Sequence, residues 1–218
     1  MARPVKKTPE QWRADILRAA QELFRTKGYE AASVSDIMAL AGGAKGMFYH
    51  FFQSKEDVMY ALGKQLFLKN NPFEAVRSRT DLTALQKIRL LLALNRGDVE
   101  RNDLNTQAIP ILNDPHLLAA AVAENRRILT PLWLELLEEG KQDGSIQTEY
   151  VQELSELLPL INFWFLPSIF PANQAALRHK YQFVCAVLSH MGLPLLEEEG
   201  VTTFAQALID GFTEGEAQ

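Results

Sequence analysis

The sequence predicts an all-α protein, and three features of its pattern support this prediction. Apolar residues recur at spacings of three and four along most of the 218 residues, which is the repeat of an amphipathic helix. Many of these segments begin at a capping residue such as Thr8, Ser33 or Ser54 and end at glycine or proline. No stretch of alternating apolar and polar residues is long enough to predict a strand. The pattern corresponds to about nine or ten helices.

The first predicted helix begins at Thr8 and ends at Gly28. Thr8 is a typical N-cap, Pro9 suits the first helical position, and Gln11 completes a capping box. Because the apolar side chains of this helix share one face, we expect that face to pack inward. These side chains belong to Trp12, Ile16, Ala19, Leu23 and Phe24.

The next segment, residues 33–57, predicts two short helices joined by a glycine turn. A serine capping box starts a helix that reaches Ala41, and two glycines follow, which allow a tight turn because glycine adopts positive φ at little cost. Residues 44–51 predict a helix of about two turns, with Phe48 and Phe51 directed inward. This order is typical of a helix-turn-helix whose second helix enters the DNA major groove. Spacing alone also allows a helical hairpin with an ordinary aromatic core.

The remaining pattern predicts longer helices. A capping box at residues 54–57 starts a helix that extends to about Lys69. Pro131 and Pro159 each fall inside a later helical pattern, so we expect the first to kink or split its helix and the second to interrupt its own. The later predicted helices span 82–94, 104–112, 115–142, 148–166 and 173–191, and a short last one carries Phe204, Leu208 and Phe212.

Charge is distributed unevenly along the chain. The net charge of −5 argues against a protein that binds nucleic acid over its whole surface. Residues 1–55, however, contain nine Lys or Arg and five Asp or Glu, whereas the rest contains 13 and 22. They include a short basic arm formed by Arg3, Lys6 and Lys7. A basic segment joined to an acidic body is expected of a module that meets phosphates at one end.

The residues present exclude several classes of protein. The single cysteine, Cys185, allows no internal disulfide and no thiolate metal cluster, and its apolar neighbours predict a buried, unreactive thiol. The longest apolar run, residues 157–171, is shorter than the ~20 residues that span a bilayer. Because there is also no signal-peptide pattern, we expect a cytoplasmic protein that does not associate with membranes. There is no phosphate loop, zinc spacing, nucleophile elbow or di-iron motif, so we expect neither an enzyme nor a bound metal or cofactor.

An ordered set of residues runs through the first quarter of the chain. It consists of Ile16, Ala19, Ala20, Leu23, Phe24, Gly28, Tyr29, Ser33, Val34, Asp36, Ile37, Ala41, Gly42, Lys45, Gly46, Phe48, Tyr49, His50, Phe51, Phe52, Ser54, Lys55 and Glu56. Through this highly specific set, the chain resembles the DNA-binding domain of the TetR family of transcriptional regulators. The resemblance implies a three-helix helix-turn-helix domain at residues 1–55. It also implies a helical effector-binding and dimerisation domain at residues 56–218.

The short second helix of the motif supplies most of the predicted DNA surface. Lys45 can donate to guanine in the major groove, and Met47 can contact a thymine methyl group. The resemblance assigns phosphate contacts to Tyr49 and His50, for which half-buried packing is the alternative. Solvated surface charge is the alternative for each lysine. Helix N-termini add amide groups that favour an anion. The predicted DNA-binding residues are Ser33, Ala44, Lys45, Gly46, Met47, Tyr49, His50 and Lys55.

Two residues depart from the pattern of the family. Where the family usually has an aliphatic residue, this chain has Gly43, and we expect the turn to lose a core contact. Where the family usually has Ser or Thr, this chain has Ala44. The second change removes a phosphate donor and a side-chain cap worth about 1 kcal/mol. Neither change is expected to break the module.

The C-terminal part predicts a dimer interface. Residues 157–166 are apolar on nearly every side, which indicates contact with the core on one face and with a partner on another. With residues 173–191 they would form a two-helix face that pairs with a second copy as a four-helix bundle. A fully internal helix in a monomer is the alternative. The resemblance likewise implies a homodimer, whose two DNA-binding domains would read half-sites about 34–36 Å apart.

The resemblance also implies a small-molecule pocket in the C-terminal domain. Such pockets are mostly apolar with a few polar groups, although a plain core or interface role is the alternative for each candidate residue. We therefore expect a ligand-responsive repressor that binds a pseudo-palindromic operator as a homodimer and is released when an effector shifts the fourth helix. The alternative is a helical small-molecule-binding or adaptor protein with a vestigial DNA module. The candidate lining residues are Phe67, Asn95, Asn105, Gln107, Trp133, Phe163 and Trp164.

Overall fold

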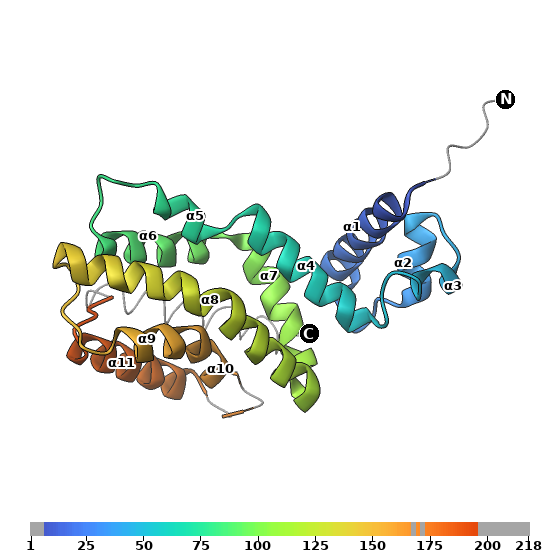
Figure 1. Ribbon diagram of the computed structural model, residues 1–218. Coiled ribbons are helices and arrows are strands. Elements are labelled where there is room, and N and C mark those ends of the chain that lie inside the picture. The colour runs from blue at the N-terminus through green and yellow to red at the C-terminus, as the bar shows by residue number, and fades with distance from the viewer. Residues whose placement is uncertain (1–6, 167–168, 171–172, 196–218) are drawn as a thin grey trace. The chain divides into compact units, whose positions relative to one another are not determined.

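A computed structural model describes residues 7–166, 169–170 and 173–195 (Figure 1). The described residues form helices with short connections, and no strand occurs among them, which confirms the all-α prediction. No helix in these ranges is long and apolar enough to cross a bilayer. The basic residues Arg3 and Lys6 lie outside the described residues, as does the predicted last helix with Phe204, Leu208 and Phe212.

The chain divides into two compact units. The first contains the described residues up to 70 together with residues 100–108. The second contains residues 71–99 and the described residues from 109 onward. Helix α7 (Val99–Ala108) therefore folds almost entirely with the first unit, although part of the second unit precedes it in the chain.

The first unit opens with two helices that begin where the sequence predicts. Helix α1 spans Pro9–Lys27 and α2 spans Val34–Ala41. Complete capping boxes at Thr8 and Ser33 start them. In each box the side chain of the N-cap residue accepts from the backbone amide three residues on, and the side chain of that third residue accepts from the N-cap amide. The largest fully buried side chains of these helices are Ile16, Phe24, Ile37 and Met38.

Helix α3 spans only Lys45–Phe48, whereas the sequence predicts a helix over residues 44–51. The amides of Phe51 and Phe52 both donate to the carbonyl of Phe48, at 2.9 and 3.0 Å. Phe52, rather than the expected Phe51, joins Phe48 in the core. Phe48 and Phe52 are buried with ring centroids 5.8 Å apart, and Phe51 is half-buried.

Helix α4 (Lys55–Lys69) begins at its predicted N-cap, Ser54, which accepts a hydrogen bond from the amide of Asp57. The Asp57 carboxylate accepts from the amide of Gln53 at 2.9 Å. The reciprocal half of the expected capping box is therefore shifted by one residue, which still satisfies a backbone donor ahead of the helix. The buried side chains of α4 are Val58, Met59, Leu62 and Leu66.

The second unit begins with a helix that the sequence prediction misses. Helix α5 (Pro72–Arg77) is capped by Asn71, whose side chain accepts from the amide of Phe73. Helix α6 spans Ala84–Gly97 and starts at a capping box on Thr83, close to the predicted range. The Asn-Pro pair predicted only the end of α4, although proline at the first helical position also starts helices.

Prolines shape the later helices in different ways. The short helical segment expected at 104–112 is confirmed only in part, because α7 begins earlier, at Val99, and ends two residues before Pro110, after which residues 109–113 form a 3₁₀ turn. Helix α8 (Pro115–Asp143) continues through Pro131, so that proline does not split it. Pro159 does interrupt its helix, as expected. The segment forms α9 (Val151–Leu157), a 3₁₀ turn (Leu158–Leu160) and α10 (Ile161–Trp164).

Helix α11 (Gln174–His190) forms an apolar cluster with the end of α10, in which Phe165 and Tyr181 are buried. Cys185 packs against this cluster but is only half-buried, so the buried thiol that the sequence predicts is partly exposed. Burial raises the pKa of the Cys185 thiol. Little thiolate then forms at neutral pH, which agrees with the expected low reactivity.

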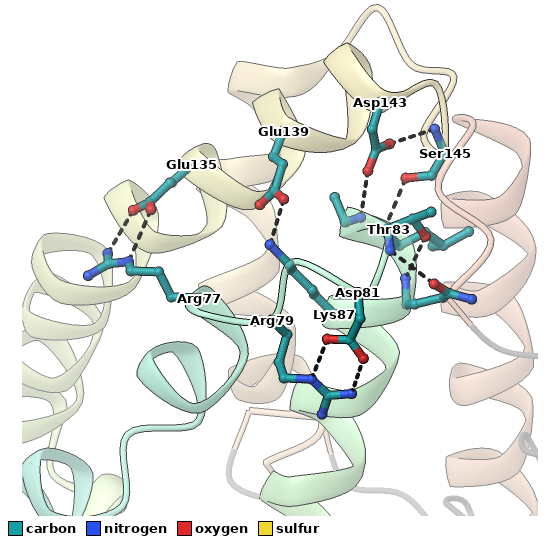
Figure 2. A network of polar contacts seen from close by, with 12 residues as sticks. Arg77, Arg79, Asp81, Thr83, Lys87, Glu135, Glu139, Asp143 and Ser145 are labelled. Carbon is teal, nitrogen blue, oxygen red and sulfur yellow. Dashed lines mark hydrogen bonds and ion pairs between the residues drawn. The ribbon is translucent and has the colours of Figure 1, made fainter.

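Ion pairs join α5 and α6 to α8, as Figure 2 shows. The guanidinium of Arg77 donates to both carboxylate oxygens of Glu135, at 3.0 and 2.7 Å. The ammonium of Lys87, whose side chain is 5% exposed, lies 2.6 Å from a carboxylate oxygen of Glu139. A buried ammonium group is costly without a partner. The Lys87–Glu139 pair therefore holds α6 to α8 within the second unit, and the more exposed Arg77–Glu135 pair adds a surface contact between α5 and α8.

The start of α6 is also held by the end of α8. The Asp143 carboxylate accepts from the amide of Ala84 at 2.7 Å, and the Ser145 hydroxyl accepts from the amide of Leu85 at 3.2 Å. Two amides that would otherwise lack partners in the first turn of α6 are thus satisfied from another element.

Candidate nucleic-acid interface

The turn between α2 and α3 is built from Gly42 and Gly43. Gly42 ends α2 in the left-handed region, with φ of 81°. A Cβ atom on Gly43 would lie 2.6 Å from Cε of Met38 and 2.9 Å from a ring carbon of Trp12. The side chains of Trp12 and Met38 therefore occupy the space that an aliphatic residue would need. The core contact expected to be lost at Gly43 is replaced by these two side chains.

Helix α3 carries the buried aromatic side chain of Phe48, and exposed side chains lie on the helix and directly after it. Phe48 has no exposed surface, whereas Tyr49 is 57% exposed and packs edge-on against Phe48 at 5.5 Å. Lys45 and His50 are also exposed. Because Phe48 fixes the helix from its inner side, Lys45 on α3 and Tyr49 and His50 directly after it are left on the surface.

Three further predicted residues lie on or beside α3. Gly46 is exposed, and a Cβ atom placed on it would meet no heavy atom within 4 Å. Met47 is half-buried, so its side chain contributes to packing as well as to the surface. Ala44 is the N-cap of α3 and supplies no side-chain hydrogen bond, as expected. The backbone of α3 is therefore open to the approach of another molecule.

Ser33 lies at the start of α2, where it is exposed. Its hydroxyl oxygen accepts from the amide of Asp36 at 3.1 Å. The ammonium of Lys27 pairs with Asp36 at 3.0 Å, and the hydrogen bonds from Lys27 and Ser33 lower the pKa of Asp36. The hydroxyl proton of Ser33 remains available to a phosphate oxygen, because a serine both donates and accepts.

Lys55 occupies a different environment from the other predicted DNA-binding residues. Its ammonium donates to the carbonyls of Tyr29 and Glu30, at 2.7 and 3.4 Å, and lies 4.0 Å from the centre of the Tyr29 ring. It therefore holds the turn after α1 to the start of α4. An ammonium has three donors, so a phosphate contact by Lys55 would use the one that remains.

Tyr29 adds a second contact between the turn after α1 and the start of α4. Its hydroxyl donates to the Glu56 carboxylate at 2.8 Å. Burial and the neighbouring Glu56 raise the pKa of Tyr29. Burial alone would raise the pKa of Glu56, but the hydrogen bond from Tyr29 and those at the helix start lower it overall. Tyr29 thus stays protonated and Glu56 ionised, which keeps this hydrogen bond charge-assisted.

The residues predicted to line a ligand pocket are divided between the units. Trp133 is buried, and its ring packs edge-on against Phe73 at 5.3 Å, while Asn105 is exposed. The side-chain amide of Gln107 donates to Asp103 at 3.0 Å. Neither unit contains the full set. Phe67, Asn105 and Gln107 lie in the first unit, and Asn95, Trp133, Phe163 and Trp164 lie in the second.

Sequence reasoning misses several contacts that position the interface. The guanidinium of Arg13 lies 4.6 Å from the centre of the Phe52 ring, and the ring of Trp12 lies against Gly43. These pairs are far apart in the chain, so no local pattern predicts them. The one available signal is the unusual glycine at position 43, which indicates that a larger side chain from elsewhere occupies its place.

Comparisons with known proteins agree with this arrangement. The model of the family described as bacterial regulatory proteins, tetR family, matches residues 16–62. The transcriptional repressor KstR2 of Rhodococcus jostii is 32% identical over 153 residues, which cover 66% of this chain and 72% of KstR2.

Solved structures show the same fold. FadR of Thermus thermophilus, a TetR-family repressor in complex with lauroyl-CoA, has a TM-score of 0.58 at 24% identity and covers 73% of this chain and 84% of its own. The fatty acid degradation regulator FadR of Bacillus halodurans has a TM-score of 0.54 at 23% identity, over 94% and 96% of the two chains.

Proposed function

Since this chain belongs to the TetR family of bacterial transcriptional regulators, we propose that it represses transcription by binding a pseudo-palindromic operator as a homodimer and leaves that operator when a small molecule binds. Its family consists of regulators and not of enzymes. A protein that binds operator DNA works in the bacterial cytoplasm, which is the location we propose.

The observation that carries this proposal is the exposed side of α3. Lys45 of α3 is exposed, as are Tyr49 and His50 directly after the helix, whereas Phe48 is buried. A lysine can read guanine, and phenol and imidazole groups can donate to phosphates. Gly46 leaves room for a close approach of the helix backbone to the base edges. The residues around α3 therefore have the chemistry that entry into a major groove requires.

The surface of α9–α11 supports the homodimer. Phe183 on α11 is 60% exposed, and its ring packs edge-on against Trp164 at 5.7 Å. Leu157 at the end of α9 is 45% exposed. Exposed apolar groups of this size favour a contact with another protein surface, and a two-fold axis lets the same face serve both copies. The two DNA-binding domains of such a dimer would also double the number of contacts with DNA.

Helix α7 is the element that we propose links effector binding to DNA binding. Its Glu100 accepts from the Gln21 amide on α1 at 2.6 Å and pairs with Lys69 on α4 at 3.4 Å. Arg101 donates to the carbonyl of Asn70 at 2.6 Å. Because α7 continues directly from α6 of the second unit, a change there can reach α4, provided that the effector binds the two states with different affinities.

Two observations favour one chemical class of effector. The solved Thermus thermophilus relative contains lauroyl-CoA, and the predicted lining residues of this chain are mainly aromatic. We propose an effector with a large apolar part, held by aromatic side chains and oriented by a few amides. A panel of acyl-CoA esters and uncharged lipophilic compounds tests this class. Ligands would be detected by release of the bound DNA.

The DNA-binding proposal is tested by selection from random duplexes. We expect the full chain to enrich a pseudo-palindrome whose half-site centres are about 34–36 Å apart. Binding to that sequence should weaken linearly in log–log salt titrations, because phosphate contacts release counterions. The alternative, a helical ligand-binding or adaptor protein with a vestigial DNA module, predicts no enriched sequence and a flat salt response.

A further inference from the structure

Arg13 lies in the second turn of α1 and is held against the segment that follows α3. Its side chain is exposed, and its guanidinium lies 4.6 Å from the centre of the Phe52 ring. Phe52 is itself buried and packs against Phe48, the buried residue of α3. A cation over the face of an aromatic ring is attracted by the negative charge of that face. The ring therefore orients a charged side chain that remains exposed.

Arg13 also differs from the other arginines of α1 in its polar contacts. In the part of the chain that the structure describes, Arg13 donates no hydrogen bond and forms no ion pair. The other two arginines each pair with a carboxylate of the same helix, Arg18 with Asp15 and Arg25 with Glu22. Asp15 is occupied a second time, by Lys7 at 2.7 Å. No carboxylate of the described residues therefore neutralises Arg13.

Arg13 and its neighbour Trp12 contact the chain at the two ends of α3. The Trp12 ring occupies the space beside Gly43, in the turn before that helix, and Arg13 lies over Phe52 after it. This turn of α1 therefore lies beside α3. A major groove is ~12 Å wide and is bordered by two sugar-phosphate strands. Side chains that flank a helix in the groove consequently lie close to phosphates.

The segment that Arg13 contacts is the one that contains the proposed phosphate contacts. Tyr49 and His50 are both exposed and come three and two residues before Phe52. A guanidinium stays charged at every pH at which a protein is folded and carries five N–H donors. Arg13 therefore adds a permanent positive charge next to a phenol and an imidazole.

We propose that Arg13 binds a phosphate of the strand that borders the groove occupied by α3. This inference rests on the proposed function, because it needs α3 to lie in a major groove. A guanidinium can stack on an aromatic face while it presents two N–H groups to one phosphate. The family match gives Arg13 no role, since it covers residues 16–62. The competing role is packing, in which the arginine stem only covers the Phe52 ring.

Removal of the charge at Arg13 is tested with two controls. Arg13→Met removes the guanidinium but keeps an unbranched apolar stem for the Phe52 ring. Arg25→Met removes a paired cation from the same helix, and Lys64→Met removes an exposed cation from α4. On the duplex selected by the full chain, we expect Arg13→Met to bind about tenfold more weakly, with a salt slope lower by about one per protomer. Each control should change the affinity less than about threefold.

The stability of the same variant separates phosphate binding from packing. Urea unfolding of Arg13→Met should give the same free energy of unfolding as wild type, because the stem still covers the ring. Three results would overturn the phosphate contact. They are an affinity equal to that of wild type, a loss no larger than in the controls, and a loss of affinity accompanied by a comparable loss of stability.

Neutral methylphosphonate linkages, placed one at a time along the selected duplex, locate the phosphate that Arg13 binds. We expect one position in each half-site where wild type and Arg25→Met lose affinity several-fold and Arg13→Met loses none, because the two changes remove the same contact. Identical profiles for the three proteins would contradict the inference. A changed base preference of Arg13→Met on duplexes with single base-pair substitutions would also contradict it, since phosphate contacts carry no sequence information.

Failure of this inference can be told apart from failure of the proposed function. If Arg13→Met binds like wild type while the full chain still selects a palindrome, only the role of Arg13 is rejected. If the full chain selects no palindrome, the proposed function itself is rejected.

Discussion

The surface around α3 and the core of the second unit differ in whether their charged side chains have hydrogen-bond or ion-pair partners within the chain. Within the described residues, the side chains of Lys45 and His50 make no hydrogen bond or ion pair, whereas Lys87 in the second unit is buried against Glu139. The two regions also differ in the free space around their glycines. A Cβ atom on Gly46 would meet nothing, whereas one on Gly192 would lie 1.7 Å from the carbonyl oxygen of Gln147.

The difference separates residues that hold the fold from residues that are available to a partner. Groups that are paired inside the chain cannot also bind DNA without breaking a contact. Groups that are anchored from behind but open in front, as on α3, can bind with little rearrangement. The predicted DNA-binding residue Lys55 belongs to the paired class, because its ammonium is engaged by two carbonyls.

The largest expected effect on stability comes from substituting Gly192, with Gly46 as the matched control. Gly192→Ala forces a side chain into the left-handed region, at φ of 81°, and against a backbone carbonyl. We expect the free energy of unfolding to fall by about 3 kcal/mol. Gly46→Ala, the matched control, should leave it unchanged or raise it by up to about 1 kcal/mol. Urea unfolding measures both, and equal losses would remove the contrast between the two regions.

A smaller loss of stability is expected from removing the Asp143 carboxylate, which caps α6. Burial alone would raise the pKa of Asp143, but hydrogen bonds from Ser145 and from the amide of Ala84 lower it overall. A carboxylate with a lowered folded pKa stabilises the protein above its ordinary pKa, and this contribution is lost as the pH falls through the folded value. We therefore expect Asp143→Ala to cost about 1 kcal/mol at pH 7.

The same pair of proteins supplies the pH test. Unfolding free energies of wild type and Asp143→Ala should converge as the pH falls below about 4, near the ordinary aspartate value. A difference that stays constant down to pH 2 would show that Asp143 acts by packing instead of by charge.

The smallest effect is expected at Ala44, the one helix start in the motif without a side-chain cap. Its backbone is already extended, with φ of −85° and ψ of 147°, which suits a capping serine. Ala44→Ser should stabilise the protein by about 0.5–1 kcal/mol. Calorimetry would detect this as a small rise in Tm, and a fall in Tm would indicate that the hydroxyl cannot reach the amides of α3.

The sequence predicts local features of this fold well. The capping boxes at Thr8 and Ser33 depend on residues three apart, so they can be found from spacing alone. Pro159 interrupts its helix because the restriction lies within the proline ring and its missing N–H. The exposed residues of α3 also follow from local pattern, since the buried Phe48 sets the inner side of that helix.

Features that depend on distant residues are not predicted. Lys55 looks like a free cation in the sequence, and only the fold brings it to the carbonyls of Tyr29 and Glu30. The gap left by Gly43 is filled by Trp12, from an earlier helix. The division of the candidate pocket residues between two units likewise follows from α7 folding with the first unit.

The central claim is that the exposed side chains on α3 and directly after it serve DNA binding and contribute little to the fold. The most direct test measures both properties of Lys45→Ala combined with Tyr49→Ala, on the duplex selected by the full chain. We predict that affinity falls at least about 100-fold, corresponding to one base contact and one phosphate contact per head, while the free energy of unfolding changes by less than about 0.5 kcal/mol. Unchanged affinity, or a loss of affinity that is accompanied by an equal loss of stability, would contradict the claim.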